Sequence, residues 1–395
     1  MTEPGANTPF VAIACGGTGG HLFPGLAVAE QLTRRGCAVA LLISPKDVDQ
    51  QAVKSARGVE IITLPAAALQ NRNYLSFAGS FVKSLFAAQK VFRRRKPDAV
   101  LTMGGFTGAP PVWVGKNFGA KTFLHESNTI PGRANRLLAR FVDGAFVGFP
   151  EAVARLKTRK VKTTGTPVRP QFQPGDAAGC RTALGLESDR PMIMVMGGSQ
   201  GASGINEMIL SALPLLAGRD WQWLHLAGAG GFEKVKQAYA ARGFSAVVKP
   251  FFAEMDIALG AATAAVSRAG ASSLAELAAM RLPSLLVPFP AAAGDHQFFN
   301  ARAFEKTGAA RLLEQKDATP EKVAAMLREL VENEPARKAM QAALVKWHAP
   351  KAAEQIAENI LSAIPRSAAT GDFSPARRSG EKDAARGEMN LKVAA

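Results

Sequence analysis

Cysteine and histidine are scarce in this chain, with three cysteines and five histidines among 395 residues. Cys15, Cys37 and Cys180 form no C-x-x-C pair and share no metal-ligand spacing with the histidines. The sequence therefore predicts neither a disulfide framework nor a metal site, and a reducing compartment suits it best.

Long apolar runs are also missing. The first nine residues lack a basic segment, and the apolar run 10–15 is too short for a signal peptide or a membrane-spanning helix. We therefore expect any contact with a membrane to be made from its surface.

Acidic residues are few in the first half of the chain, where residues 1–170 carry 23 Lys and Arg against 9 Asp and Glu. Residues 171–395 carry 25 against 23, so almost all of the net charge of +16 belongs to the first half. An excess of this kind suits nucleic acid, anionic lipid or a phosphorylated substrate. No aromatic-basic recognition module accompanies the charges, so nucleic acid is not an expected partner.

Strand-like apolar runs alternate with helical patterns along most of the chain, which is typical of βαβ units on parallel sheets. The length favours two such domains. In the first half we predict helices over 24–35 and 130–140. The predicted strands span 10–15, 38–43, 59–64, 99–103, 121–125 and 144–147, then 192–196, 221–226, 246–248, 264–267, 284–287 and 310–313.

The Gly- and Pro-rich stretch 163–170 interrupts this alternation and is the predicted domain linker. We predict an N-terminal domain over 1–165 and a C-terminal domain over 166–365, with the last helix, 350–364, packing back on the first domain. Residues 366–395 lose apolar periodicity, which predicts a flexible tail.

Three glycine-rich turns follow predicted strands, at 16–20, 104–105 and 197–201. Glycines between a strand and a helix let backbone N–H groups approach a phosphate, although any one such turn is explained equally well by tight bending. Three of them favour two anionic ligands. The first turn departs from G-x-G-x-x-G, because Leu22 replaces the last glycine, so a dinucleotide site is disfavoured.

Seven motifs in order carry a specific resemblance: GGTGGHLFPGLAVAEQL, MGGF, HESNTIPGRANRLLA, TGTPVR, GGSQGA, SRAGASSLAELAAM and PFPAAAGDHQFFNA. With these motifs the chain, from about Phe10 to Ile364, resembles the MurG family. The resemblance implies an α/β fold of two facing Rossmann-like domains with parallel sheets, the GT-B architecture, and a cleft between them. Family members use no metal or other cofactor.

The resemblance also implies the reaction. An inverting glycosyltransferase would move GlcNAc from UDP-GlcNAc to the C4 hydroxyl of MurNAc in undecaprenyl-pyrophosphoryl-MurNAc-pentapeptide (lipid I), giving lipid II for peptidoglycan. UDP-GlcNAc and lipid I are therefore the expected ligands, and proteins of cell-wall synthesis and division are expected partners.

The donor residues follow from the family's motifs, with the diphosphate at Ser199 and Gln200 and at Arg169, which is otherwise a solvated hinge charge. Glu276 would accept hydrogen bonds from the ribose hydroxyls. Phe252 would lie beside uracil or belong to the core. Gln297 and Asn128 would bind the sugar, and further donor contacts would come from Thr18, Gly19, Gly20, Ala271, Ser272, Ser273, Leu274 and Ala275.

The acceptor hydroxyl is a weak nucleophile, so a general base is expected. His21 is our first candidate, because imidazole titrates near neutrality, and Glu126 is the second. The alternative for His21 is capping the loop or binding phosphate. Gly104 and Gly105 would receive the acceptor.

Residues 74–96 (YLSFAGSFVKSLFAAQKVFRRRK) place Phe77, Phe81, Leu85, Phe86 and Phe92 among six cations. This pattern predicts a surface helix that binds anionic membrane, at the cytoplasmic face of the inner membrane, or else a helix packed on the sheet with a basic end.

Two other functions fit parts of the pattern. One is a different UDP-sugar enzyme, such as a glycolipid transferase or a UDP-GlcNAc 2-epimerase, although the HESN and PGRANR segments argue against it. The other is a non-catalytic UDP-GlcNAc-binding protein, although His21 and Glu126 are both present.

Overall fold

The computed structural model describes residues 8–17, 19–46, 50, 53, 58–65, 74–158, 160–197 and 203–365, and of residues 74–77 and 106 the backbone alone. The expected tail, 366–395, and the predicted donor residues Thr18, Ser199 and Gln200 lie outside these ranges.

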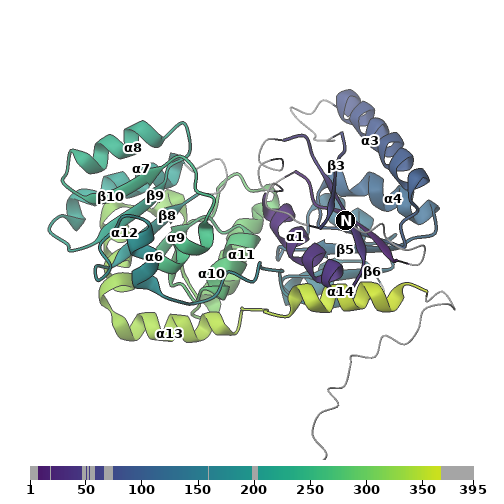
Figure 1. Ribbon diagram of the computed structural model, residues 1–395. Helices are drawn as coiled ribbons and strands as arrows, with labels where there is room; N and C mark the ends of the chain where they lie inside the picture. The colour runs from purple at the N-terminus through teal and green to yellow at the C-terminus, as the bar shows by residue number, and fades with distance from the viewer. Residues whose placement is uncertain are drawn as a thin grey trace, which may run out of the picture. The chain divides into compact units, whose positions relative to one another are not determined.

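The strands of the first half form one parallel sheet in the order β3-β2-β1-β4-β5-β6-β7 (Figure 1). They are β1 (Phe10–Ala14), β2 (Ala38–Ile43), β3 (Glu60–Thr63), β4 (Ala99–Thr102), β5 (Lys121–Glu126), β6 (Gly144–Val147) and β7 (Val161–Thr163). The helices of this N-terminal lobe are α1 (Gly19–Arg34), α3 (Tyr74–Arg94), α4 (Ala109–Asn117) and α5 (Arg133–Leu138), with short 3-10 turns at Phe106–Gly108 and Pro150–Arg155.

The second half repeats the arrangement, with the strand order β10-β9-β8-β11-β12-β13. Its strands are β8 (Met192–Met196), β9 (Gln222–Leu226), β10 (Ser245–Lys249), β11 (Ala264–Ser267), β12 (Ser284–Leu286) and β13 (Arg311–Leu312). Its helices are α6 (Ala177–Ala183), α7 (Ser203–Ala212), α8 (Phe232–Ala240), α9 (Met255–Ala261), α10 (Ala271–Ala279), α11 (His296–Lys306), α12 (Pro320–Glu332) and α13 (Glu334–Val345), with 3-10 turns at Leu213–Leu216, Ala293–Asp295 and Gln315–Asp317. Two parallel α/β sheets confirm the predicted fold class.

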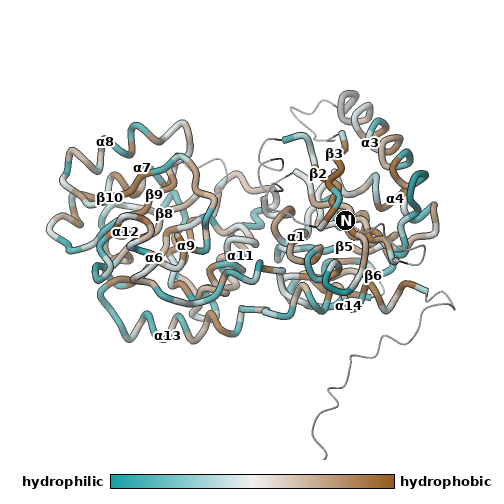
Figure 2. The backbone as a smooth tube through the Cα atoms, viewed as in Figure 1, coloured by the Kyte–Doolittle hydropathy of each residue, from teal (hydrophilic) through white to brown (hydrophobic). Residues whose placement is uncertain are grey.

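The central strands of each sheet are buried on both faces, which explains why they are almost continuously apolar. Along β1, Val11 and Ile13 join one core cluster while Ala12 and Ala14 join another, because successive side chains point to opposite faces. The first cluster contains α1, and the second contains α3, α4 and α5. In Figure 2, brown hydrophobic stretches lie inside both lobes.

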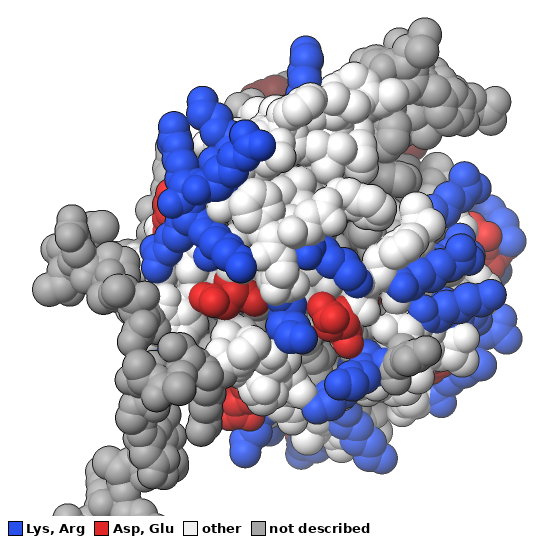
Figure 3. Space-filling view, turned by 90° about the vertical axis from the view of Figure 1, so that its right-hand side faces the viewer, with Lys and Arg blue, Asp and Glu red and all other residues white. Residues whose placement is uncertain are grey.

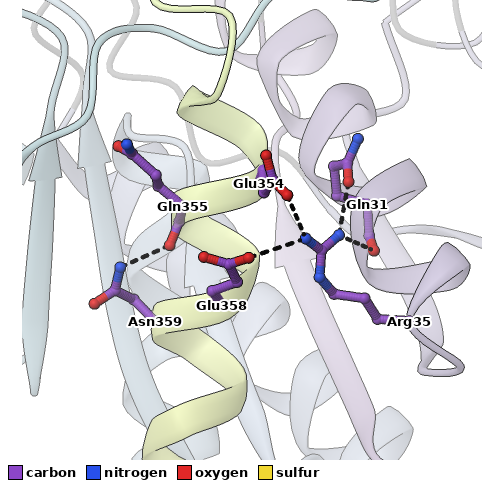
Figure 4. Close-up of polar contacts among 6 residues, drawn as sticks. All are labelled: Gln31, Arg35, Glu354, Gln355, Glu358 and Asn359. Atoms are coloured by element: carbon purple, nitrogen blue, oxygen red, sulfur yellow. Dashed lines mark hydrogen bonds and ion pairs between the residues drawn. The ribbon is translucent and has the colours of Figure 1, made fainter. Parts of the chain in front are cut away.

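The last helix, α14 (Ala352–Ala363), follows α13 in sequence but packs on the N-terminal lobe. Ile356 and Ile360 are fully buried among residues of α1 and β1. Arg35 at the end of α1 lies 3.2 Å from both Glu354 and Glu358 (Figure 4). The C-terminal segment therefore covers one face of the first sheet.

The start of the first helix was predicted wrongly. We expected the first helix to begin at Pro24, but α1 begins at Gly19, so Pro24 lies inside it and His21 lies in its first turn. A helical N–H normally bonds the carbonyl four residues earlier, and proline has no N–H to give. The carbonyl of Gly20 is therefore left without its helical partner.

Candidate functional site

Both sheets reverse their strand order between the first and fourth strands, which are β1 and β4 in one lobe and β8 and β11 in the other. Loops at the carboxyl ends of strands flanking such a switch point form the usual ligand crevice. The loops after β1, β4, β5 and β11, together with the helices that follow them, carry most of the predicted site residues that the structure describes.

The glycine loop after β4 lies directly against His21. A Cβ built on Gly104 would stand 3.3 Å from His21 Nε2, and one on Gly105 would stand 3.3 Å from His21 Cε1. Both glycines have positive φ, 112° and 79°. Side chains rarely adopt this backbone and would displace the imidazole, so the loop has to be glycine where His21 packs on it.

Glu126, at the end of β5, is buried and organises the neighbouring loop. Its Oε1 accepts hydrogen bonds from Asn128 N at 2.8 Å and Asn128 Nδ2 at 3.0 Å. Its Oε2 accepts from Gly132 N at 3.0 Å and Asn135 Nδ2 at 2.7 Å. Four donors therefore occupy both oxygens and fix Asn128 and Asn135 relative to this carboxylate.

His125 is buried beside the same cluster. One ring nitrogen, Nε2, lies 3.1 Å from the carbonyl of Gly165, and the other, Nδ1, lies 3.2 Å from Ser127 Oγ. The pKa of His125 is lowered to about 4, mainly by burial; the hydrogen bond to the Gly165 carbonyl opposes this shift and the nearby His21 adds to it. His125 is therefore neutral at physiological pH and serves as a fixed hydrogen-bonding group.

On the donor side, Arg169 lies between two aromatic rings. Its guanidinium stands 4.4 Å from the ring centre of Phe23 on α1 and 5.0 Å from that of Phe172. Its buried Nε has no hydrogen-bond partner among the described residues. A half-buried cation whose buried Nε–H has no acceptor is suited to an anionic ligand, which supports the predicted diphosphate contact.

Glu276 on α10 carries the clearest electrostatic signature of the donor side. Burial raises its pKa to about 7, Arg169 opposes that rise, and Asp256 adds to it. The carboxyl is thus near Arg169, as a shared nucleotide site requires. A strongly shifted carboxyl beside a crevice is typical of a functional position.

The amino terminus of α10 touches that of α1. Ser272 Oγ donates a 2.8 Å hydrogen bond to the carbonyl of Gly20, the carbonyl that Pro24 leaves unbonded. The N-cap of α10, Gly270, offers no side-chain cap, so the first N–H groups of this helix are available to a ligand.

The other predicted donor residues are distributed unevenly. Ser273 and Ala275 are half-buried on α10, whereas Ala271 and Leu274 are buried in the lobe's core. Phe252 packs partly on the core with Lys249 Nζ 4.6 Å from its ring centre. Gln297 Oε1 accepts from Phe289 N at 3.0 Å, which fixes the turn before α11, and Gly19 packs on Phe23.

Sequence reasoning missed Asn300, a fully buried amide on α11. Its Oδ1 accepts from Thr129 N and Thr129 Oγ1, both at 2.9 Å. Its Nδ2 donates to Asn128 Oδ1 at 3.0 Å and to the carbonyl of Ala269 at 3.2 Å. Asn300 thus connects the loop held by Glu126 with the segment that precedes α10.

Family models match both halves of the chain. The glycosyltransferase family 28 N-terminal domain matches residues 11–147, and the C-terminal domain of the same family matches residues 192–358.

Curated relatives match over nearly the whole length. A protein of Anaeromyxobacter sp. strain Fw109-5 is 36% identical over 367 residues, covering 90% of this chain and 93% of the relative. One of Syntrophus aciditrophicus is 35% identical, covering 90% and 98%. Both are named UDP-N-acetylglucosamine–N-acetylmuramyl-(pentapeptide) pyrophosphoryl-undecaprenol N-acetylglucosamine transferase.

Solved structures agree. The MurG crystal structure of Acinetobacter baumannii superposes with a TM-score of 0.69 at 26% identity, covering 90% of this chain and 99% of the other. A Medicago truncatula glycosyltransferase with UDP-glucose has a TM-score of 0.64 at 14% identity, covering 89% and 98%, and shows the fold alone. With both domain models matched and relatives above 30% identity over most of its length, the chain belongs to the MurG family.

Proposed function

We propose that this protein transfers GlcNAc from UDP-GlcNAc to the MurNAc C4 hydroxyl of lipid I, giving lipid II. The single observation that carries the activity is the match to curated transferases of this name over about nine-tenths of the chain. The same match supports it over a 2-epimerase or a non-catalytic binding protein.

The donor contacts are part of this proposal. Arg169 would meet the diphosphate with its unused Nε–H, and the amino terminus of α10 would add backbone N–H groups. Glu276, when ionised, would accept hydrogen bonds from both ribose hydroxyls. Asn128, Gln297 and the residues outside the described ranges, Thr18, Ser199 and Gln200, would complete the donor site.

His21 is the proposed general base. It would take the proton of the C4 hydroxyl while that oxygen bonds the anomeric carbon and the bond to the UDP oxygen breaks, with inversion. Glu126 is the weaker candidate, since four hydrogen bonds occupy its two oxygens. Its support for Asn128 and Asn135 is a positioning role. The Gly104–Gly105 loop, which lies on His21, would receive the acceptor.

We also propose that the N-terminal lobe binds the cytoplasmic face of the inner membrane. In the described ranges no helix is long and apolar enough to cross a bilayer. Val82 and Phe86 on α3 are 47% and 67% exposed, and Trp113 on the adjacent α4 is 54% exposed. Phe92, which we predicted in the same stripe, is instead buried in the core. The exposed cations nearby are Lys83, Lys90, Arg93, Arg94 and Lys116.

The test is incubation of the full chain with labelled UDP-GlcNAc and a short-chain lipid I analogue, followed by product analysis. The expected product is the β-1,4-linked disaccharide lipid together with UDP. A parallel reaction without acceptor separates the alternatives: sugar epimerisation there would indicate a 2-epimerase. Nucleotide binding with no product in either reaction would indicate a non-catalytic protein.

A further inference from the structure

The N-terminal lobe has a second hollow, at the edge of its sheet where strands begin. A cavity of about 920 Å³ is lined there by the first residues of β5 and β6, by the loop before β7 and by the end of α14. The glycine loops and His21 follow the opposite, carboxyl ends of the strands. The hollow is therefore separate from the proposed catalytic crevice.

Cations dominate the polar lining of this hollow. A single carboxylate, Asp143, lies among them, and its Oδ2 already accepts hydrogen bonds from Thr122 N at 2.8 Å and Thr122 Oγ1 at 2.9 Å. Figure 3 shows this side of the molecule, with Lys and Arg spread over it and only a few Asp and Glu between them. The five basic residues lining the hollow are Lys121, Arg140, Lys157, Lys160 and Lys162.

None of these five cations has a carboxylate partner, in contrast to some other Lys and Arg side chains of the described residues. Arg35, Arg190 and Arg311, for example, each pair with a carboxylate. Within the part of the chain that the structure describes, no ion pair involves any of the five. Lys162 Nζ donates instead to Asn359 Oδ1 on α14. Like charges around a concave surface repel one another and raise the local positive potential, which an anion would relieve.

Two buried aromatic side chains, Phe123 and Phe146, belong to the lining of the hollow. Phe123 and Phe146 stack with ring centres 5.8 Å apart, and both are buried. Positive charges around a concave surface above buried apolar groups are screened less by water and salt than charges on an open convex surface. The volume falls in the range of small-molecule sites, which is more room than a single inorganic phosphate needs.

We propose that this hollow is an anion site of its own, which binds a ligand carrying more than one phosphate charge. A soluble diphosphate compound and an anionic lipid headgroup share this chemistry. Either would contact Lys157 and Lys160 from the loop before β7, together with Arg140, which also lines the hollow. This site is additional to the donor diphosphate site.

The test is calorimetric titration of the full chain with inorganic pyrophosphate, with saturating UDP-GlcNAc present to block the donor site. A second arm measures co-sedimentation with vesicles of phosphatidylcholine containing phosphatidylglycerol. Both arms use the wild type, K157Q/K160Q and K234Q/K236Q. The last removes two exposed lysines of α8 and is the matched control.

We expect K157Q/K160Q to weaken binding about tenfold or more in at least one arm, while K234Q/K236Q binds like the wild type. Loss in the pyrophosphate arm assigns a soluble ligand, and loss in the vesicle arm alone assigns a lipid headgroup. Saturable binding in neither arm, or equal losses in both double variants, would overturn the proposal. GlcNAc transfer by K157Q/K160Q in detergent, equal to wild type, shows that the fold and the catalytic crevice are intact.

Discussion

His21, the proposed base, lies in the first turn of α1 and packs against the backbone of Gly104 and Gly105. His21→Ala removes the imidazole but none of the groups proposed to hold UDP. We expect transfer to fall about tenfold or more, since general base catalysis contributes about 10²–10⁴-fold. UDP-GlcNAc affinity, measured by calorimetry, should change less than about twofold.

The control is His348→Ala, which removes a half-buried histidine after α13 and should retain wild-type turnover. A His21→Ala protein that transfers as fast as wild type would exclude His21 as the base. The four hydrogen bonds of Glu126 make Glu126→Gln informative as well, because an amide can keep only part of that network.

Glu276 should make donor binding depend on pH. Burial raises its pKa to about 7, so the fraction ionised grows as pH rises through neutrality. Only the carboxylate accepts from both ribose hydroxyls, so UDP-GlcNAc affinity should increase between about pH 6 and about pH 8. Glu276→Gln should bind more weakly at the higher pH, with a nearly flat profile by calorimetry. A pH dependence that survives in Glu276→Gln would refute the assignment.

The same shift affects the stability of the free protein in the opposite sense. The unfolded carboxyl ionises near its ordinary pKa of 4.5, whereas the folded one ionises near 7. Between these values the folded protein binds more protons than the unfolded chain, so this group's stabilisation is lost as pH rises through about 7. Bound UDP-GlcNAc should reverse the trend.

Among the elements, α14 offers a test of what holds the end of the chain to the N-terminal lobe. Ile360 is fully buried, whereas Glu354 and Glu358 remain 43% and 57% exposed in their pairs with Arg35. Ile360→Ala should lower the free energy of unfolding by about 2–5 kcal/mol. E354Q/E358Q should lower it by less than about 1 kcal/mol, because exposed ion pairs are weak. Urea denaturation measures both, and the reverse ranking would show that the ion pairs dominate.

The apolar surface of α3 and α4 predicts membrane binding. Phe86 and Trp113 are each more than half exposed, and burying such a side chain contributes about 1.5–3 kcal/mol. F86S/W113S should reduce co-sedimentation with anionic vesicles at least about tenfold. Val345→Ser, which removes a 47% exposed valine on α13, is the control and should sediment like wild type. Unchanged sedimentation of F86S/W113S would place the membrane contact elsewhere.

The strands were predictable because burial on both faces leaves an apolar run bounded by turns, as for β2, β6 and β8. The start of α1 was not, because proline usually marks a helix start, and Pro24 lies inside this one. β7 was missed because this strand has only three residues, is partly exposed and lies next to the Gly- and Pro-rich stretch 163–170. The hydrophobic pattern around a polar residue does not show whether that residue belongs to a binding site or lies on the open surface.

At the scale of the whole molecule, contacts between distant segments decide the site, and these lay beyond sequence reasoning. Residues 128 and 300 are 172 positions apart, and nothing local to either predicts their hydrogen bond. The roles of Glu276 and Gln297 came from the family's motifs rather than from their own patterns. The same limit applies to Ser272. Its hydroxyl donates to the carbonyl of Gly20, which has no helical partner because Pro24 lies four residues later.

Substitutions of Asn300 therefore test whether these contacts between distant segments hold the site together. Asn300→Ala leaves buried groups of Thr129 and Ala269 unpaired, so the free energy of unfolding should fall by about 2 kcal/mol or more. Asn359→Ala, an amide substitution at a more accessible position on α14, should cost less than about 0.5 kcal/mol.

Asn300→Asp tests positioning through substrate binding, because its buried carboxylate also lowers stability. Its retained oxygen can still accept from Thr129, but both donated bonds, to Asn128 Oδ1 and the carbonyl of Ala269, are lost. If Asn300 positions Asn128 for the donor sugar, this variant should raise the KM for UDP-GlcNAc and leave the KM for the lipid I analogue unchanged. A displaced Asn128 should affect the binding of UDP-GlcNAc alone. An equal change in both KM values, or no change in either, would therefore show that Asn300 only stabilises the packing.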